Sequence, residues 1–454
     1  MNETKPKKRL LTTRQLEFLA IGGTIGAGIF LGMGQGIRVA GPSMMLAYAL
    51  AGMMLFVITR CLGEMTLQHA CATPLLALTK QYIGEKTAFV QGWSYWACLI
   101  LACMAELTAA GVFVHALVPA IPGWAVAAGA LAPLFAVNRV RVGLFGQIEF
   151  WMALLKIATL VVFLVVGVAL ILYPSLDAAH GTAVGQLWRD GGVFPNGASG
   201  FFAALPMALF AFGGAELIGL AAPEAAHPHR AVPRAINRFF ARILLFYIGA
   251  ALVVICCFHW YAVPIDHSPI AAIFGRVGVP GAETLIIVVL VTAMLSACNS
   301  AVYASSRIVR SLADIGAAPQ RLAVLNTHGS PEKALTLSIA VVAVTVLLNY
   351  LVPDMLFQLL LGMGALTIVI DWAIVLVAHL RFCKTHAHRA PIACRPPLSP
   401  WSNYAVLALI SSVFLISAME PRLRIALFLN MILFGGLTVI AHARDGSAPY
   451  AASH

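Results

Sequence analysis

The amino-acid sequence predicts an all-α polytopic membrane protein with twelve transmembrane helices, and three observations support this fold class. Hydrophobic residues make up 61% of the 454 residues and charged residues only 10%, against about 45–50% and about 25% in soluble domains. Apolar windows of about 17–25 residues, each long enough to cross a bilayer, recur along the chain. Lys and Arg are concentrated in alternate connections between these windows, as membrane topology requires.

We predict membrane spans at residues 16–40, 43–66, 87–117, 121–137, 146–173, 198–221, 239–262, 280–305, 334–352, 355–380, 402–418 and 423–442. With a cytoplasmic N-terminus, 22 of the 29 Lys and Arg residues lie on the cytoplasmic side, five lie on the other side and two lie within windows. This bias predicts cytoplasmic tails at 1–15 and 443–454. The net charge of +11 follows from topology, because the basic residues are scattered and form no nucleic-acid-binding face.

The first window contains a glycine-rich stretch, Ile21 to Gly36, in which seven of sixteen residues are glycine: IGGTIGAGIFLGMGQG. Glycine does not enforce helical backbone angles, and unwound backbone within a bilayer is tolerated only where it faces protein or a polar ligand. We therefore expect a broken helix whose free amides bind an anionic group such as a carboxylate. The alternative is close helix crossing, for which membrane glycines are also used.

The third and fifth windows carry ionisable residues. Lys156 lies fifteen residues after Arg141, about 22 Å along a helix, and a lysine at that depth is functional by default. Burial favours its neutral form, so it can exchange a proton; its ammonium can equally replace a sodium ion. The alternative is a structural pair with Glu149, seven residues earlier. Glu106, in MAELTAAG, can line a pathway, take a proton or cap a broken helix end.

The sixth window, like the first, contains residues that interrupt a helix. It reads FAALPMALFAFGGAELIGLAAPEA, and the helix is interrupted around Glu216 by Pro206, Gly213, Gly214, Gly219 and Pro223. Phe210 precedes this break by one turn and can close over a ligand. Interrupted first and sixth helices, five spans apart, indicate two inverted halves with a binding site at their interface.

The remaining windows offer fewer candidates. Asp371 lies deep in the tenth window, in VIDWAIV, and its role is left open. Glu64 lies near one end of the second window and is expected to be a structural or gate ion-pair partner. The nine cysteines contain no CxxC pair and are interpreted as small core residues. We predict no metal site and no cofactor, and we assign the paired histidines to solvated loops: His227, His229, His386 and His388.

The chain resembles bacterial amino acid permeases of the amino acid–polyamine–organocation superfamily, in the amino acid transporter group. The resemblance spans Leu11 to Ala443 and rests on IGGTIGAGIFLG, AGPS, LGEM, QGWSYW, MAELTAAG, FGQIEFWMALLKI, FAFGGAELIGLAAPEAAHPHRAVPRAI, RILLFYIG and NSAVYASSR. It implies a LeuT-like fold of two five-helix inverted repeats, at 16–175 and 198–382, followed by two extra helices at 400–442.

The resemblance also implies roles for individual residues. The amides of Gly26, Ala27 and Gly28 would bind the substrate carboxylate, and carbonyls near Thr24, Phe210 and Gly213 would hold its amino group. Phe210 would be an aromatic gate, and Glu216 would line the site. Lys156 would replace a bound sodium and link transport to protons, with Glu106 and Glu216 as further coupling groups. Two departures stand out: the loop 67–79, and Asp371 where relatives carry Asn.

We therefore expect a proton-coupled amino acid importer of the cytoplasmic (inner) membrane that works by alternating access. Its partners are an amino acid, a proton and the lipid bilayer, and it is a monomer or a weak homo-oligomer. An amino acid exchanger on the same fold, or a membrane sensor that binds an amino acid, are the alternatives; an enzyme is not expected. The glycines specify how a substrate backbone is held and leave the side chain open.

Overall fold

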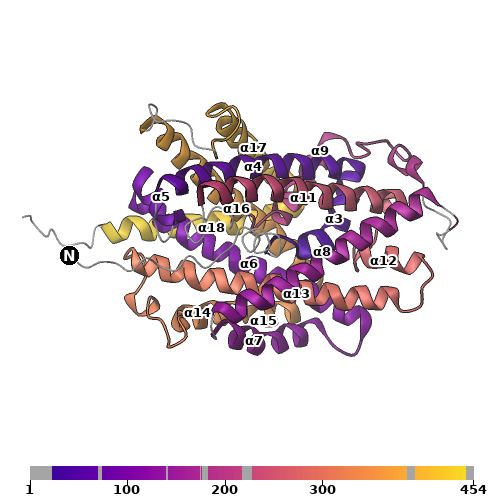
Figure 1. Ribbon diagram of the computed structural model, residues 1–454, viewed down its shortest axis with the longest axis horizontal. Helices are drawn as coiled ribbons and strands as arrows, with labels where there is room; N and C mark the ends of the chain where they lie inside the picture. Colours follow the sequence, from indigo (N-terminus) through magenta and orange to yellow (C-terminus); the bar gives the residue numbers. More distant parts are fainter. Residues whose placement is uncertain are drawn as a thin grey trace, which may run out of the picture.

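The computed structural model describes residues 23–69, 74–139, 142–173, 175, 183–216, 228–385 and 394–445. All the regular elements within these residues are helices. Figure 1 shows most of them running side by side as a bundle along the longest axis of the molecule. The N-terminal tail, part of the variant loop 67–79 and the stretch after Glu216 fall outside the described residues, as do His227, His386 and His388.

The first predicted window is broken where its glycines cluster. A helical stretch at residues 23–24 ends in a bend at Ile25 and Gly26, and two helices follow, α2 (Ala27–Phe30) and α3 (Gly32–Ala40). Gly41 then adopts φ of +63°, a left-handed conformation that glycine accepts without strain. It starts the short turn Gly41–Ser43 that leads into α4 (Met44–Gln68).

The sixth window is interrupted as well. Helix α9 (Gly197–Ala211) ends five residues before Glu216, the position around which the sequence predicted the break. Residues 212–216 form a turn rather than a continued helix, and Gly214 has φ of +95°. A left-handed glycine ends a helix because it turns the chain away from the helix axis.

The other helices are α5 (Pro74–Tyr82), α6 (Glu85–Leu117), α7 (Gly123–Arg139), α8 (Val142–Leu172), α11 (Pro228–Cys257), α12 (Pro269–Arg276), α13 (Ala282–Asp314), α14 (Glu332–Val342), α15 (Val344–Leu351), α16 (Pro353–Thr385), α17 (Trp401–Met419) and α18 (Pro421–Asp445). Helices α5 and α12 lie where no window was predicted. The rest correspond to the remaining windows, although α11 begins eleven residues before its window and α13 ends nine residues after its window. The ninth window is thus divided between α14 and α15, which meet at Ala343.

Nine helical runs within the described residues are long and apolar enough to cross a membrane. Three features explain why this number is below twelve. Helices α3 and α4 form one run through the turn at Gly41–Ser43, α7 has only 17 residues, and α9 is shortened to 15 residues by its break. The chain is a polytopic membrane protein, and the count of twelve spans stays a prediction.

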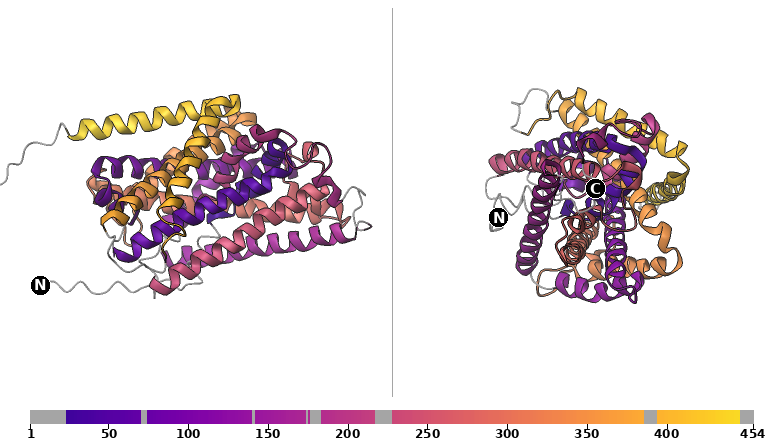
Figure 2. Two further views of the ribbon diagram at one scale, coloured as in Figure 1. Left: turned by 90° about the horizontal axis from the view of Figure 1, so that it is seen from above. Right: turned by 90° about the vertical axis from the view of Figure 1, so that its right-hand side faces the viewer.

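Burial separates central from peripheral helices. In both α6 and α16, 72% of the spanning residues are buried, whereas the share is 28% for α17 and 17% for α18. Figure 2 shows α18 along one outer edge of the bundle. Its exposed side chains, such as Phe428 and Met431, are apolar, as expected of a surface that contacts lipid. The centre of the bundle therefore lies around α6 and α16.

One pair of cysteines corrects the interpretation of all nine as isolated core residues. Cys103 in α6 and Cys298 in α13 form a disulfide, with Cα atoms 4.3 Å apart. This pair could not be predicted from the sequence, because 195 residues separate its members. Six other cysteines among the described residues are free, and Cys71 lies outside those residues.

Candidate functional site

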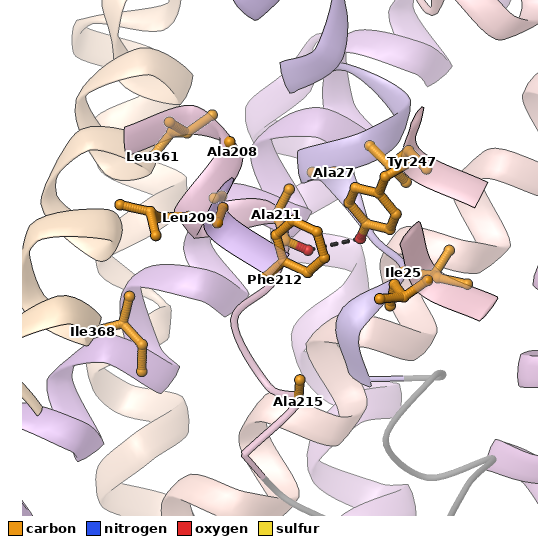
Figure 3. Packing of buried hydrophobic residues seen from close by; sticks show 14 of the residues in the cluster. Ile25, Ala27, Ala208, Leu209, Ala211, Phe212, Ala215, Tyr247, Leu361 and Ile368 are labelled. Atoms are coloured by element: carbon orange, nitrogen blue, oxygen red, sulfur yellow. Dashed lines mark hydrogen bonds between the residues drawn. The ribbon is translucent and has the colours of Figure 1, made fainter. Parts of the chain in front are cut away.

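The two broken helices meet at their breaks. A Cβ atom at Gly28 in α2 would lie 2.7 Å from the Cα atom of Ala211, the last residue of α9. A Cβ at Gly214 would lie 3.0 Å from the carbonyl oxygen of Gly23. Such close backbone approach is possible only because both positions lack side chains. Figure 3 shows Ala27 and Ala211 side by side in this region.

Tyr247 of α11 connects the two breaks from one side. Its hydroxyl lies 2.7 Å from the carbonyl oxygen of Ala211, a contact drawn in Figure 3, and 3.1 Å from the carbonyl oxygen of Thr24. Both carbonyls belong to turns of backbone that no longer continue as a helix. Tyr247 is fully buried, so it supplies a donor in the place of water.

A cavity of about 60 Å³ lies between the breaks. One water needs about 10–15 Å³ of such volume, so only a few fit. The described residues that line it are Gly23, Thr24, Gly28, Cys98, Leu99, Ala102, Glu106, Phe210, Ala211, Gly213, Gly214, Glu216, Ala297, Ser300, Ala301, Gly364 and Ile368. Six of the predicted site residues thus share one cavity: Thr24, Gly28, Glu106, Phe210, Gly213 and Glu216.

Phe210 closes against α16. A Cβ at Gly364 would lie 2.9 Å from Cε2 and 3.0 Å from Cδ2 of the Phe210 ring. The ring therefore rests on the backbone of Gly364, where any larger residue would push it away. The Phe210 carbonyl accepts a hydrogen bond from the Gly213 N–H at 3.0 Å and keeps one lone pair for a further donor.

Glu106 caps the broken first helix. Its two carboxylate oxygens each accept a hydrogen bond from the Ala27 N–H, at 2.9 Å. Of the three roles that the sequence allowed for Glu106, the geometry of two is present, since the residue caps a broken helix end and also lines the cavity. The residue is only 7% exposed, and a buried carboxylate needs such a charge-assisted bond. Gly26 and Ala27 themselves lie beside the cavity rather than in its lining.

Glu216 caps the second break. Its carboxylate accepts hydrogen bonds from the Tyr95 hydroxyl at 2.8 Å and from the Gly214 N–H at 3.2 Å. Tyr95 comes from α6, so this contact joins the turn after α9 to the central helix of the bundle. At each of the two breaks, a carboxylate therefore accepts a hydrogen bond from a backbone N–H: Glu106 at the first break and Glu216 at the second.

Lys156 lies in the core but outside the cavity lining. It is 1% exposed and interacts electrostatically with Glu149 and with Glu106. Glu149 in turn accepts a hydrogen bond from Ser296 of α13 at 3.2 Å. The lysine is therefore placed among carboxylates of α6 and α8, one of which reaches the cavity.

Asp371 does not line the cavity either. It is 2% exposed and lies one turn along α16 from Ile368, which does. The Ser94 hydroxyl donates to its Oδ1 atom, and the Gln91 amide donates to its backbone carbonyl at 3.3 Å. Its Oδ2 atom has no hydrogen-bond partner among the described residues.

Several functional positions were not singled out from the sequence. Tyr247 and Tyr95 lie within two of the recognised motifs, RILLFYIG and QGWSYW, but nothing in one sequence marks which residue faces the site. Ser300 likewise lies within a recognised motif, NSAVYASSR, whereas Cys98 and Gly364 lie in apolar helices without any local signal. Knowledge of which helix faces point inward is needed to find them.

Comparison with known proteins agrees with this geometry. A family profile described as "Amino acid permease" matches residues 15–444. The chain is 38% identical to "Amino-acid permease AapA" of Bacillus subtilis, over 95% of this chain and 94% of that protein. It is 37% identical to "Uncharacterized transporter YdgF" of the same organism, over 96% of each. It is 36% identical to "Aromatic amino acid transport protein AroP" of Escherichia coli K12, over 93% and 92%.

Proposed function

The chain belongs to the amino acid permease family, and we propose that it imports an amino acid across the bacterial cytoplasmic membrane by proton symport with alternating access. The observation that carries this proposal is the pair of broken helices that meet at one cavity. Backbone amides and carbonyls that leave a helix offer an anion and a cation site a few ångströms apart, which is what a zwitterion requires. The wider fold we propose is twelve spans with two inverted repeats and both termini cytoplasmic.

The substrate carboxylate is proposed to bind the amides of residues 26–28. Its amino group is proposed to bind the carbonyls of Thr24, Phe210 and Gly213, near the Glu216 carboxylate. The wall that α6, α13 and α16 contribute to the cavity includes small residues, such as Cys98, Ser300 and Gly364, beside the larger Leu99 and Ile368. That wall would contact the substrate side chain and thereby determine which amino acids are accepted.

Alternating access is proposed because the cavity lies among buried residues of the bundle core, so the substrate has to be admitted from each side of the membrane in turn. Phe210 lies in the lining and rests on Gly364, so a shift of this ring changes access to the site. Lys156 supplies a coupling group because it is an amine in the core with carboxylates on two helices. An amine in the core whose surroundings change during transport can bind a proton in one conformation and release it in another.

Substitution of Gly28 tests the location of the site. In Gly28→Val the side chain would start 2.7 Å from the Ala211 backbone, so α2 and α9 must separate and the amides must move. We expect binding of amino acids to be lost, measured by thermal shift of the purified protein against a panel of the common amino acids. Gly435→Val is the matched control, because a Cβ at Gly435 meets nothing within 4 Å.

Normal affinity in Gly28→Val would contradict the site. The direction and mode of transport need a second measurement, radiolabelled uptake into proteoliposomes with and without internal substrate. Uptake that requires internal substrate would identify an exchanger instead of an importer. Binding without any uptake would identify a sensor.

A further inference from the structure

Glu106 already holds an amide that the proposed site would present to a substrate. The Ala27 N–H donates to both of its carboxylate oxygens at 2.9 Å. A Cβ at Gly26 would overlap Glu106 Oε1, so the carboxylate rests directly on the backbone of the broken helix. Glu106 also lines the cavity beside Gly28 and Thr24. A side-chain carboxylate therefore occupies a position suited to a substrate carboxylate.

Glu106 has a second partner of a different kind. Lys156 attracts it electrostatically, although Lys156 interacts more strongly with Glu149. The cap on Ala27 is thus not the only favourable contact available to the Glu106 carboxylate in this core. A carboxylate that leaves the amide has an ammonium in its surroundings, which lowers the cost of leaving.

We propose that Glu106 is an internal competitor for the carboxylate of the amino acid substrate, and that binding of the substrate takes up a proton at Glu106. The inference rests on the proposed amino acid site and adds to it how substrate and proton are linked. One N–H cannot serve two carboxylates fully, and two adjacent carboxylates repel each other. A protonated Glu106 loses this repulsion and its strength as an acceptor, so it yields the amide to the substrate.

The groups around Glu106 support this linkage. Lys156 and Glu149 face it from α8, the Tyr247 hydroxyl faces it from α11, and Glu216 shares the cavity after α9. Lys156 is the cation of this set, and it is shared with Glu149. The substrate's amino group is assigned to the carbonyls near Glu216, so its carboxylate adds negative charge beside Glu106, where one ammonium already serves two carboxylates. Uptake of a proton restores the local balance. By thermodynamic reciprocity, acidification must then tighten substrate binding.

Calorimetry on the purified protein tests this proposal. An amino acid that the protein binds is titrated in two buffers of different ionisation enthalpy, which counts the protons taken up. Wild type is expected to take up a proton and to bind more tightly as the pH falls. Glu106→Gln is expected to bind about tenfold more tightly at neutral pH, because a neutral acceptor is weaker than a carboxylate, and to take up no proton.

Glu332→Gln is the matched control, because it makes the same chemical change at a carboxylate of α14 that pairs with Arg139 and does not line the cavity. We expect its affinity and its proton uptake to equal those of wild type, with any change in affinity below about twofold. A second experiment changes the ligand instead of the protein, so it does not depend on whether a variant folds. The amide derivative of the same amino acid lacks a carboxylate, so it should bind wild type without proton uptake.

Weaker binding by a folded Glu106→Gln protein, or binding to wild type with no proton uptake, would overturn the inference and identify Glu106 as a structural cap. If the variant does not fold, equal proton uptake with the amino acid and its amide would overturn the inference on wild type alone. Failure of wild type to bind any amino acid is a different result, and it would contradict the proposed function itself.

Discussion

Tyr247 shows how much one side chain contributes at a broken helix. A single hydroxyl proton lies within hydrogen-bonding distance of two backbone carbonyls, those of Thr24 and Ala211. Buried carbonyls without donors are costly, and here they belong to two different helices. The hydroxyl therefore fixes the positions of the two broken helices of the proposed site relative to each other.

Removal of this hydroxyl should destabilise the protein. In Tyr247→Phe the ring stays and the donor is lost, so we expect the free energy of unfolding to fall by about 1–3 kcal/mol. Thermal unfolding in detergent measures the change. Tyr404→Phe is the control, because Tyr404 is 48% exposed on α17. Equal melting temperatures for the two variants would show that Tyr247 does not bridge the breaks.

Gly364 is the second residue whose effect can be predicted. In Gly364→Ala the new methyl carbon would lie 2.9 Å from the Phe210 ring, closer than carbon atoms approach without strain. The ring must move, so we expect weaker substrate binding, by about tenfold or more, as for overpacking worth 1–3 kcal/mol. Phe210→Leu in the same protein should recover part of the loss, because the smaller side chain makes room. Unchanged affinity in Gly364→Ala would mean that Phe210 does not depend on this contact.

At the scale of helices, a buried cluster of hydrogen-bonded side chains joins α4, α16 and α17 away from the cavity. His379 Nε2 lies 2.9 Å from Glu64 Oε2, and its Nδ1 lies 2.9 Å from the Asn403 amide nitrogen. With Asn403 donating to Nδ1, the Nε2–H is directed at the Glu64 carboxylate. Glu64 was expected to be an ion-pair partner, and His379 is the partner that the sequence did not indicate.

This cluster of Glu64, His379 and Asn403 should contribute strongly to the stability of the protein. His379→Leu leaves a buried carboxylate without its partner, which costs about 3–5 kcal/mol when a buried pair is broken. We expect a lower melting temperature for this variant. The double variant with Glu64→Leu should be more stable than His379→Leu alone, because no unpaired charge remains. A double variant that is less stable than the single one would contradict a paired role for Glu64.

The sequence predicted where helices lie more reliably than which residues contact one another in the fold. Clustered glycines locate the two breaks because backbone freedom is a local property. The role of Glu106 could not be chosen among three, since its direction depends on how α6 packs against α2. The Cys103–Cys298 pair and the Phe210–Gly364 contact join residues far apart in sequence, and a single sequence carries no record of such pairing. The boundary of α9 was missed by a few residues because a turn can begin before its glycines.

For the whole molecule, the distribution of charge in the core is the feature most closely tied to transport. Glu106, Glu149 and Asp371 are buried within helices, Glu216 is buried in the turn after α9, and Lys156 is the buried lysine among the described residues. Charges in a bilayer are expensive, so groups of this kind are retained for proton or ion pathways. A proton that moves onto or off this set changes which carboxylates remain charged.

Lys156→Met should separate binding from coupling. The variant keeps a side chain of similar length and loses the exchangeable proton, so we expect amino acid binding to persist and accumulation against a gradient to be lost. Lys80→Met, in an exposed position on α5, is the control for the loss of a lysine. Concentrative uptake in Lys156→Met equal to that of Lys80→Met would assign coupling to another group.

The most direct measurement is uptake of a radiolabelled amino acid into proteoliposomes under an imposed pH gradient. The account predicts accumulation above equilibrium when the outside is acidic, and collapse of that accumulation on addition of a proton ionophore. Accumulation that is indifferent to the ionophore, or that depends on sodium, would contradict proton-coupled import by this protein.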